Sequence, residues 1–221
     1  MPGLVVGALI GLASLQTQDA VAFFPTGQVW ATPTAPYFVN PSFTDAAAGT
    51  AAQQIAAIQR AASEWKSAGQ IPFQFIYAGT TAVNFVAPGD GVNAIFYSPG
   101  ANGGGALATT TWSFDNQNKM TGFDMQFFDF VSNINPVWAI NPNFSQFDIE
   151  GVAVHEFGHA IGLAHSGVAN ATMFPSVNPG SISARTLDAD DISGVQSLYG
   201  VQATGMPSLN QVSPWHDHVD S

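Results

Sequence analysis

Three histidines in the second half of the chain have the spacing of metal ligands. His155 and His159 are four residues apart, so on a helix their side chains lie on one face, one turn apart. His165 follows six residues later, and Gly162 lies between them. Glycine most readily adopts the positive φ that ends a helix sharply and turns the chain back. Three imidazoles with one open coordination position describe a catalytic zinc site rather than a closed structural one.

Glu156 directly follows the first of these histidines. It projects from nearly the same face of the expected helix without having to bind the metal. A carboxylate there can accept a proton from a metal-bound water and return it to a leaving group. The motif therefore predicts hydrolysis at one Zn²⁺, with Glu156 as the catalytic residue. Core histidines on an amphipathic helix are the alternative, but three of the five histidines fall at ligand spacing.

The composition excludes several classes of protein. The 221 residues are 46% hydrophobic and 9% charged, which is enough apolar material for one buried core. Four basic residues against 15 acidic ones give a net charge of -11, whereas nucleic acids and anionic membranes require clustered cations. With no cysteine, disulfides, thiolate zinc sites and cysteine nucleophiles are excluded.

The N-terminus has features of an export signal. Residues 4–15 form an apolar run too short to span a bilayer as a mature helix, and residues 20–22 (Ala-Val-Ala) offer a small-x-small cleavage pattern. We therefore expect residues 1–22 to be a signal peptide, Phe23 to be the first mature residue, and the protein to be secreted. Because no Lys or Arg precedes the apolar run, a buried N-terminal strand or a truncated gene start stays open as an alternative.

Periodicity and turn residues predict one α+β domain. A helix with an apolar stripe is expected from the capping-box sequence at residues 50–53 to Gly69, a second from Asp148 to about Leu163, and a third over 188–199. Strands are expected at 37–40, 73–77, 82–86, 94–97, 107–113 and 122–130, with a hairpin turn at 115–118. The expected organisation is an N-terminal segment over 23–36, a domain over 37–200, and a tail or linker over 201–221.

From the histidine motif onward, the sequence resembles the metzincin metalloproteases, and among them the bacterial-type matrixin catalytic domains. Ser166 follows the third histidine, as in matrixins. Residues 171–175 resemble the Met-turn, whose methionine, here Met173, forms an apolar floor under the metal. Residues 187–200 match the matrixin C-terminal helix. Pro175 stands where astacin-like and serralysin-like relatives carry a tyrosine ligand, and Phe174 where matrixins commonly have tyrosine.

The resemblance implies a zincin-like fold, in which a twisted, mixed, five-stranded sheet carries an active-site helix, a backing helix and a C-terminal helix. It implies a secreted, monomeric zinc metalloendopeptidase that acts on protein or peptide substrates. An extended substrate would add to a sheet edge at Leu107 and Ala108. Pro175, Ser176 and Val177 would form the opposite wall of an apolar pocket.

The sequence departs from the animal matrixins in its metal and latency features. No histidine lies between residues 70 and 130, so that region cannot supply a second, structural zinc site. A cysteine-based latency device is impossible, and Asp45 is a conceivable substitute. Ca²⁺ is common in the family, with Asp90, Asp115 and Asp124 as candidate ligands here, although turn chemistry explains the first two equally well.

Two other functions stay open. One is a zinc-binding but non-catalytic adhesin-like module, which a replaced Glu156 would favour. The other is a non-proteolytic metallohydrolase built on the same helix motif. His216 and His218 are expected to lie in a solvated tail.

Overall fold

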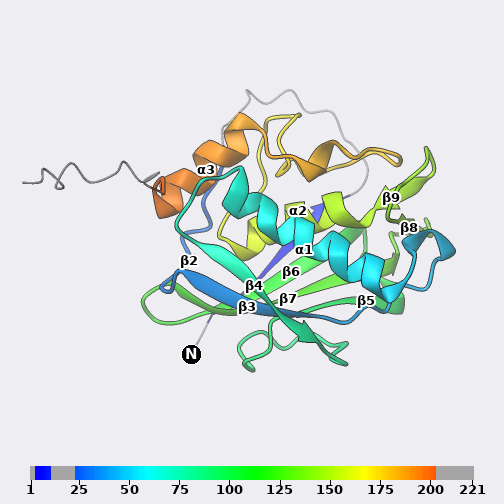
Figure 1. Ribbon diagram of the computed structural model, residues 1–221, viewed down its shortest axis with the longest axis horizontal. Coiled ribbons are helices and arrows are strands. Elements are labelled where there is room, and N and C mark those ends of the chain that lie inside the picture. Colours follow the sequence, from blue (N-terminus) through cyan, green and yellow to red (C-terminus); the bar gives the residue numbers. More distant parts are fainter. Residues whose placement is uncertain (1–2, 11–22, 203–221) are drawn as a thin grey trace, which may run out of the picture.

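The centre of the molecule is a mixed β-sheet. The computed structural model describes residues 3–10 and 23–202, and only the backbone of the first segment. The sheet has seven strands in the order β1-β6-β7-β5-β3-β4, with β2 beside β7 (Figure 1). Their bounds are Gly3–Ile10 (β1), Val29–Trp30 (β2), Thr34–Val39 (β3), Gln74–Thr80 (β4), Ala94–Asn102 (β5), Ala106–Phe114 (β6) and Lys119–Phe130 (β7). Strands β3, β4, β5 and β7 pair in parallel, whereas β6 is antiparallel to β7 and to β1.

Two helices cover one face of this sheet, and a third lies beyond them. They are α1 (Ala51–Ser67), α2 (Ile149–Ala160) and α3 (Ala189–Tyr199). Figure 1 shows α1 and α2 crossing the same face of the sheet. A separate two-stranded parallel sheet, β8 (Val137–Ala139) and β9 (Gln146–Asp148), precedes α2. The short 3₁₀ helices are η1 (Ala46–Ala48) and η2 (Ser183–Arg185).

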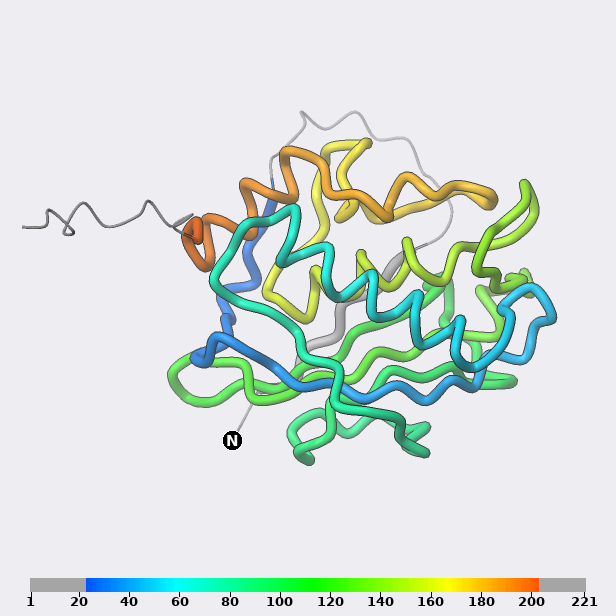
Figure 2. Tube along the Cα trace, in the orientation of Figure 1, coloured from blue at the N-terminus to red at the C-terminus, as the bar shows by residue number. Residues whose placement is uncertain are grey.

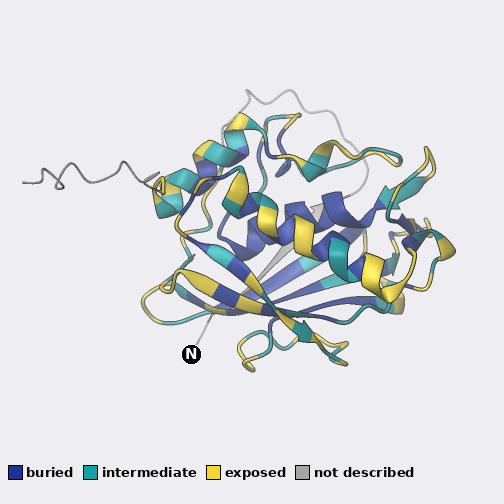
Figure 3. Ribbon diagram, in the orientation of Figure 1, coloured by how far each residue is buried: buried dark blue, intermediate teal, exposed yellow. Residues whose placement is uncertain are grey.

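Helix α2 is buried along its whole length. Every residue from Ile149 to Ala160 is buried, whereas α1 has an exposed outer face (Figure 3). The Phe157 ring packs against Phe75 of β4 with ring centroids 4.7 Å apart. On the other side, Trp65 of α1 donates a 2.8 Å hydrogen bond to the carbonyl of Val154. Because α2 is packed from the sheet and from α1, the side chains it carries have fixed positions.

The structure confirms the expected α+β architecture. All three expected helices are present, with N-caps at Thr50, Asp148 and Asp188, although α2 ends at Ala160 rather than near Leu163. The mixed sheet is present too, and β1 and β2 extend it beyond five strands. Among the described residues, no helix has the length and apolar character needed to cross a bilayer.

One predicted strand, over residues 82–86, is wrong. That segment is irregular and joins no strand ladder. Phe85 and Val86 are 57% and 38% exposed, so the apolar residues there do not line a buried face. Alternating apolar residues form a strand only where a neighbouring strand and a buried face are available.

Backbone pairing of β1 covers the edge of the sheet. Gly3–Ile10 runs antiparallel to β6, and Gly7 is opposite Thr110. Strand β1 pairs with this edge from Phe114 to Thr109 and again at Ala106, and its register shift lies opposite Leu107 and Ala108, the edge at which substrate was expected to bind. Residues 11–22, with the predicted cleavage site, lie outside the described residues, as does the segment 203–221 with its two histidines.

The segment from Phe23 to Trp30 crosses the C-terminal end of α2. The amide of Ala164 donates to the carbonyl of Phe24 at 2.7 Å, and the indole of Trp30 donates to the carbonyl of Ala160 at 2.8 Å. Figure 2 shows this blue segment running beside the orange α3 before it reaches the sheet. The N-terminal segment is thus packed against the region where the third histidine emerges.

Candidate metal centre

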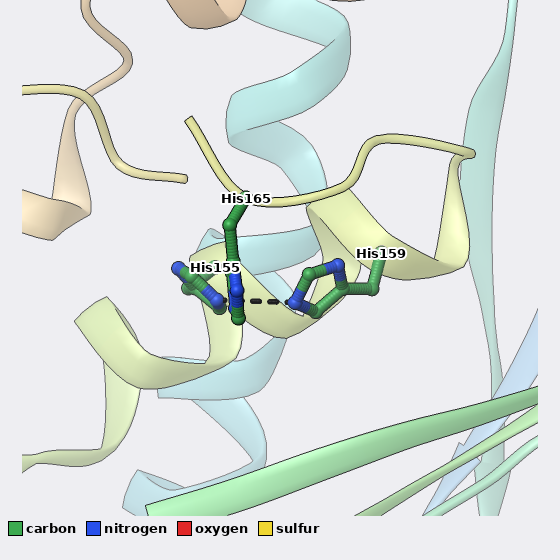
Figure 4. A group of neighbouring side chains, drawn as sticks. All are labelled: His155, His159 and His165. Carbon is green, nitrogen blue, oxygen red and sulfur yellow. Dashed lines mark hydrogen bonds between the residues drawn. The ribbon is translucent and has the colours of Figure 1, made fainter. Parts of the chain in front are cut away.

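The structure brings the three histidines of the motif together. His155 and His159 lie on α2 and are 1% and 2% exposed, and His165 is partly buried on the segment that follows (Figure 4). One ring nitrogen from each lies within 4.8 Å of the other two. The predicted ligand set is therefore one spatial cluster, formed by two consecutive helical turns and the returning chain.

Gly162 makes the turn that returns His165 to the helix. Its φ is +109°, which side-chain-bearing residues rarely adopt. A Cβ at this position would lie 2.4 Å from the carbonyl oxygen of Gln28. Leu163 then donates to the carbonyl of Gly158 at 2.9 Å, which closes the end of the helix. Only glycine satisfies both the backbone angle and the close approach of the N-terminal segment.

Backbone carbonyls fix the tautomers of the two helical histidines. The Nδ1 of His155 lies 2.7 Å from the carbonyl oxygen of Thr172, and the Nδ1 of His159 lies 2.8 Å from that of Leu163. Because a carbonyl only accepts, each Nδ1 carries the hydrogen and each Nε2 carries a lone pair. This is the arrangement in which imidazoles bind metal ions.

The spacing of the two Nε2 atoms fits a shared cation. They are 3.2 Å apart, a contact drawn as a dashed line in Figure 4. Two lone pairs that face each other repel unless a positive charge lies between them. Nitrogen ligands about 2.0–2.1 Å from a tetrahedral zinc are about 3.3 Å apart. The three imidazoles therefore fit zinc in atom type, and the pair on α2 also fits it in separation.

Burial keeps these imidazoles neutral. Desolvation, together with the neighbouring His159 and His165, lowers the pKa of His155 well below its usual 6.5. Desolvation, with His165 as the second cause, lowers the pKa of His159 to about 3. Since only neutral imidazole coordinates a metal, the folded chain holds these ligands ready at neutral pH.

The Met-turn packs directly against α2. Met173 is 1% exposed, and a Cβ on Gly158 would lie 2.2 Å from its Sδ and 2.7 Å from Cζ2 of Trp65. Residue 158 must therefore lack a side chain for the helix to approach both neighbours. The predicted methionine does lie beneath the histidine-bearing helix.

Asp191 anchors the Met-turn, a role that the sequence analysis missed. Its carboxylate accepts hydrogen bonds from the amides of Thr172 (2.7 Å) and Met173 (3.0 Å), and it is fully buried. Thr172 in turn accepts from His155, so the carboxylate positions a ligand through one peptide unit. Asp191 also completes the capping box of α3, where its carboxylate accepts from the amide of Asp188 at 2.9 Å.

Asp190 connects the segment after the third histidine to the N-terminal segment. It accepts from the hydroxyl of Ser166 at 2.7 Å and from the amide of Phe23 at 3.1 Å. The amide of Ser166 donates to the carbonyl of Met173 at 2.8 Å. The serine next to His165 is thereby held by α3 and by the Met-turn.

Glu156 is fully buried beside this cluster. The hydroxyl of Thr110, on β6, donates to its Oε2 at 2.7 Å. Sequence analysis did not single out Thr110, because nothing in a run of three threonines shows which one faces the helix.

Two cavities share residues 176–178 as a wall, and the first of them reaches the centre. One, of about 300 Å³, touches His155 and Val152 and has a largely polar far side that includes Asn170, Ser181 and Ser183. The other, of about 420 Å³, is apolar and is lined by Leu107, Val131, Ile134, Phe147 and Pro179. Ser176 and Val177 thus border both cavities, whereas Ala108 and Pro175 border neither of the two. Substrate binding at these residues stays a prediction.

The acidic residues considered for calcium are engaged by backbone amides. Asp90 accepts from Val92, Asp115 from Gln117 and Lys119, and Asp124 from Ala87 and Ala94. Within the described residues, the histidine cluster is the group of three or more side chains that could hold a metal ion together. Calcium binding stays a prediction with no residue assigned.

Asp45, named above as a substitute for a latency cysteine, accepts a hydrogen bond from the amide of Trp138 at 2.8 Å.

The lowered histidine pKa values predict how the metal-free protein responds to acid. His159 binds a proton near pH 6.5 in the unfolded chain but only near pH 3 in the folded protein. The free energy of unfolding therefore falls as the pH decreases through this window. From pH 7 to pH 5, His159 alone should lower the free energy of unfolding by about 2 kcal/mol. Urea unfolding of the metal-free wild type and of His159→Asn measures this. Equal pH dependence in the two proteins would contradict the assignment.

The turn at Gly162 predicts a specific effect on metal binding. Gly162→Ala should weaken zinc binding at least 10-fold, about as much as losing a supporting contact of a ligand. Gly200→Ala is the matched control, because residue 200 also has a positive φ, +74°, but no atom within 4 Å of an added Cβ. Competition with a chromogenic chelator gives both affinities. Equal zinc affinity in the two variants would show that the turn does not position His165.

Comparison with known proteins agrees with this geometry. Metalloendoproteinase 1 of Glycine max is 35% identical over 148 residues, which cover 66% of this chain and 45% of that protein. Interstitial collagenase of Bos taurus is 31% identical over 161 residues, which cover 72% of this chain and 29% of that protein. The chain thus matches less than half of the length of these relatives. The sequence model of the matrixin family matches residues 30–200, and the chain therefore belongs to the matrixin family.

Proposed function

We propose that this chain is a secreted, zinc-dependent metalloendopeptidase that hydrolyses internal peptide bonds of proteins. The observation that carries the proposal is the convergence of three imidazoles beside a buried glutamate. Membership of the matrixin family, and relatives named as metalloendoproteinases and a collagenase, support it.

The residues have separate roles in the proposed reaction. His155, His159 and His165 would hold the zinc, which when bound acts as a Lewis acid and makes its water more acidic. Glu156 would accept the proton of the attacking water at its carboxylate and then donate it to the departing amine nitrogen. Met173 would support the ligands from below, as its packing against Gly158 indicates.

The substrate is proposed to be an extended peptide that adds to β6. Main-chain hydrogen bonds at Leu107 and Ala108 would hold one side, and the segment Pro175–Val177 would form the opposite wall. A peptide antiparallel to β6 has its C-terminal part toward Ala106, where Leu107 lines the apolar cavity. A preference for hydrophobic side chains after the scissile bond follows from that lining.

The proposed setting is extracellular. Cleavage after Ala22 would remove the signal peptide, and the mature protein would act as a monomer without a membrane or nucleic-acid partner. The net charge of -11 supports the last point, because such partners are themselves anionic. Of the alternatives, the non-catalytic module is disfavoured because Glu156 is retained.

Replacing the proposed base tests the function directly. Glu156→Gln should bind one zinc per chain and lose casein hydrolysis by about 10²–10⁴-fold, because the proton acceptor is removed while the ligands remain. Glu64→Gln is the control, a glutamate on α1 that should leave activity within about twofold. Wild-type activity should disappear with a chelator and return with zinc.

The outcomes separate the proposed function from its alternatives. Zinc binding without hydrolysis in the wild type would favour a non-catalytic module. Hydrolysis that persists in Glu156→Gln would contradict the assigned base.

A further inference from the structure

The hydroxyl of Thr110 contacts the proposed general base. We propose that Thr110 is a positioning residue for Glu156, holding one carboxylate oxygen so that the group keeps a single orientation during the reaction. This inference rests on the proposed function, since it concerns the same base. It adds a residue that lies on the sheet, far from the histidine motif in sequence.

The geometry of the contact is specific. Thr110 Oγ1 lies 2.7 Å from Glu156 Oε2 and 3.1 Å from the backbone oxygen of the same residue. One hydroxyl hydrogen can serve only one acceptor at a time, and the nearer carboxylate oxygen forms the stronger, charge-assisted bond. Both side chains are fully buried, so water does not compete for this bond at the surface.

The position of Thr110 on β6 explains why this threonine acts alone. Successive side chains of a strand point to opposite faces, so Thr109 and Thr111 face away from the side that Thr110 occupies. Thr110 pairs with Met125 of β7, inside the sheet, which fixes its backbone. Thr111 is also buried, at 4% exposure, and therefore serves as a matched comparison.

The bond also joins the two parts of the proposed site. Strand β6 carries the edge to which the substrate would add, and α2 carries the base and two ligands. A hydroxyl between them sets the position of the carboxylate relative to a peptide held by β6. A displacement of about 1 Å at a reacting group is enough to reduce a rate about 100-fold.

The test is a hydroxyl-specific set of variants. Thr110→Val keeps the shape and removes the donor, so kcat should fall about 10- to 100-fold with KM within about twofold. Thr110→Ser keeps the donor and should recover most of kcat, and Thr111→Val should match the wild type. Zinc content and thermal unfolding are measured for each variant, and Thr110→Ala repeats the test if the valine does not fold.

A kcat that depends on the hydroxyl, with zinc content unchanged, supports the positioning role. Wild-type kcat in Thr110→Val, equal losses in Thr110→Val and Thr111→Val, or loss of zinc in Thr110→Val would each overturn it. If the zinc-loaded wild type hydrolyses no peptide, the proposed function fails instead, so the two failures are distinguishable.

Discussion

The candidate metal centre depends on holding three imidazoles close enough to share one cation. The backbone carbonyls of Thr172 and Leu163 bind the Nδ1 atoms of His155 and His159, so their Nε2 lone pairs face each other at 3.2 Å. That arrangement is unfavourable without a cation and favourable with one. Burial reinforces it, because desolvation lowers the pKa of both histidines and keeps them in the metal-binding form.

Close packing around α2 maintains this arrangement from three directions. Gly158 lets the Met-turn and Trp65 approach the helix, and Gly162 lets the N-terminal segment cross its end. Asp191 then binds the Met-turn that orients His155, and Thr110 contacts Glu156 from the sheet. These supporting contacts come from α3 and β6, which are far apart in the sequence. The metal centre is thus a product of the whole fold rather than of one helix.

The sequence predicted what depends on local spacing. The histidine motif with Glu156, the helix caps and the Met-turn are each defined by residues a few positions apart. The structure clusters the three histidines and forms the caps, while zinc binding and catalysis by these residues stay predictions. The roles of Thr110 and Asp191 depend on which distant element faces the helix, and composition contains no such information. The predicted strand over 82–86 failed for a related reason: its apolar residues have no neighbouring strand to pair with. The pairing of β1 likewise follows from the open edge of β6, which periodicity alone cannot reveal.

X-ray absorption spectroscopy of the protein loaded with one equivalent of zinc tests the central claim most directly. We expect three imidazole nitrogens at about 2.0–2.1 Å and one oxygen ligand, which is the coordination of an open catalytic site. We also expect that His165→Asn removes one imidazole from the spectrum. A spectrum with two imidazoles in the wild type, or one unchanged by His165→Asn, would contradict the claim that all three histidines hold a single ion.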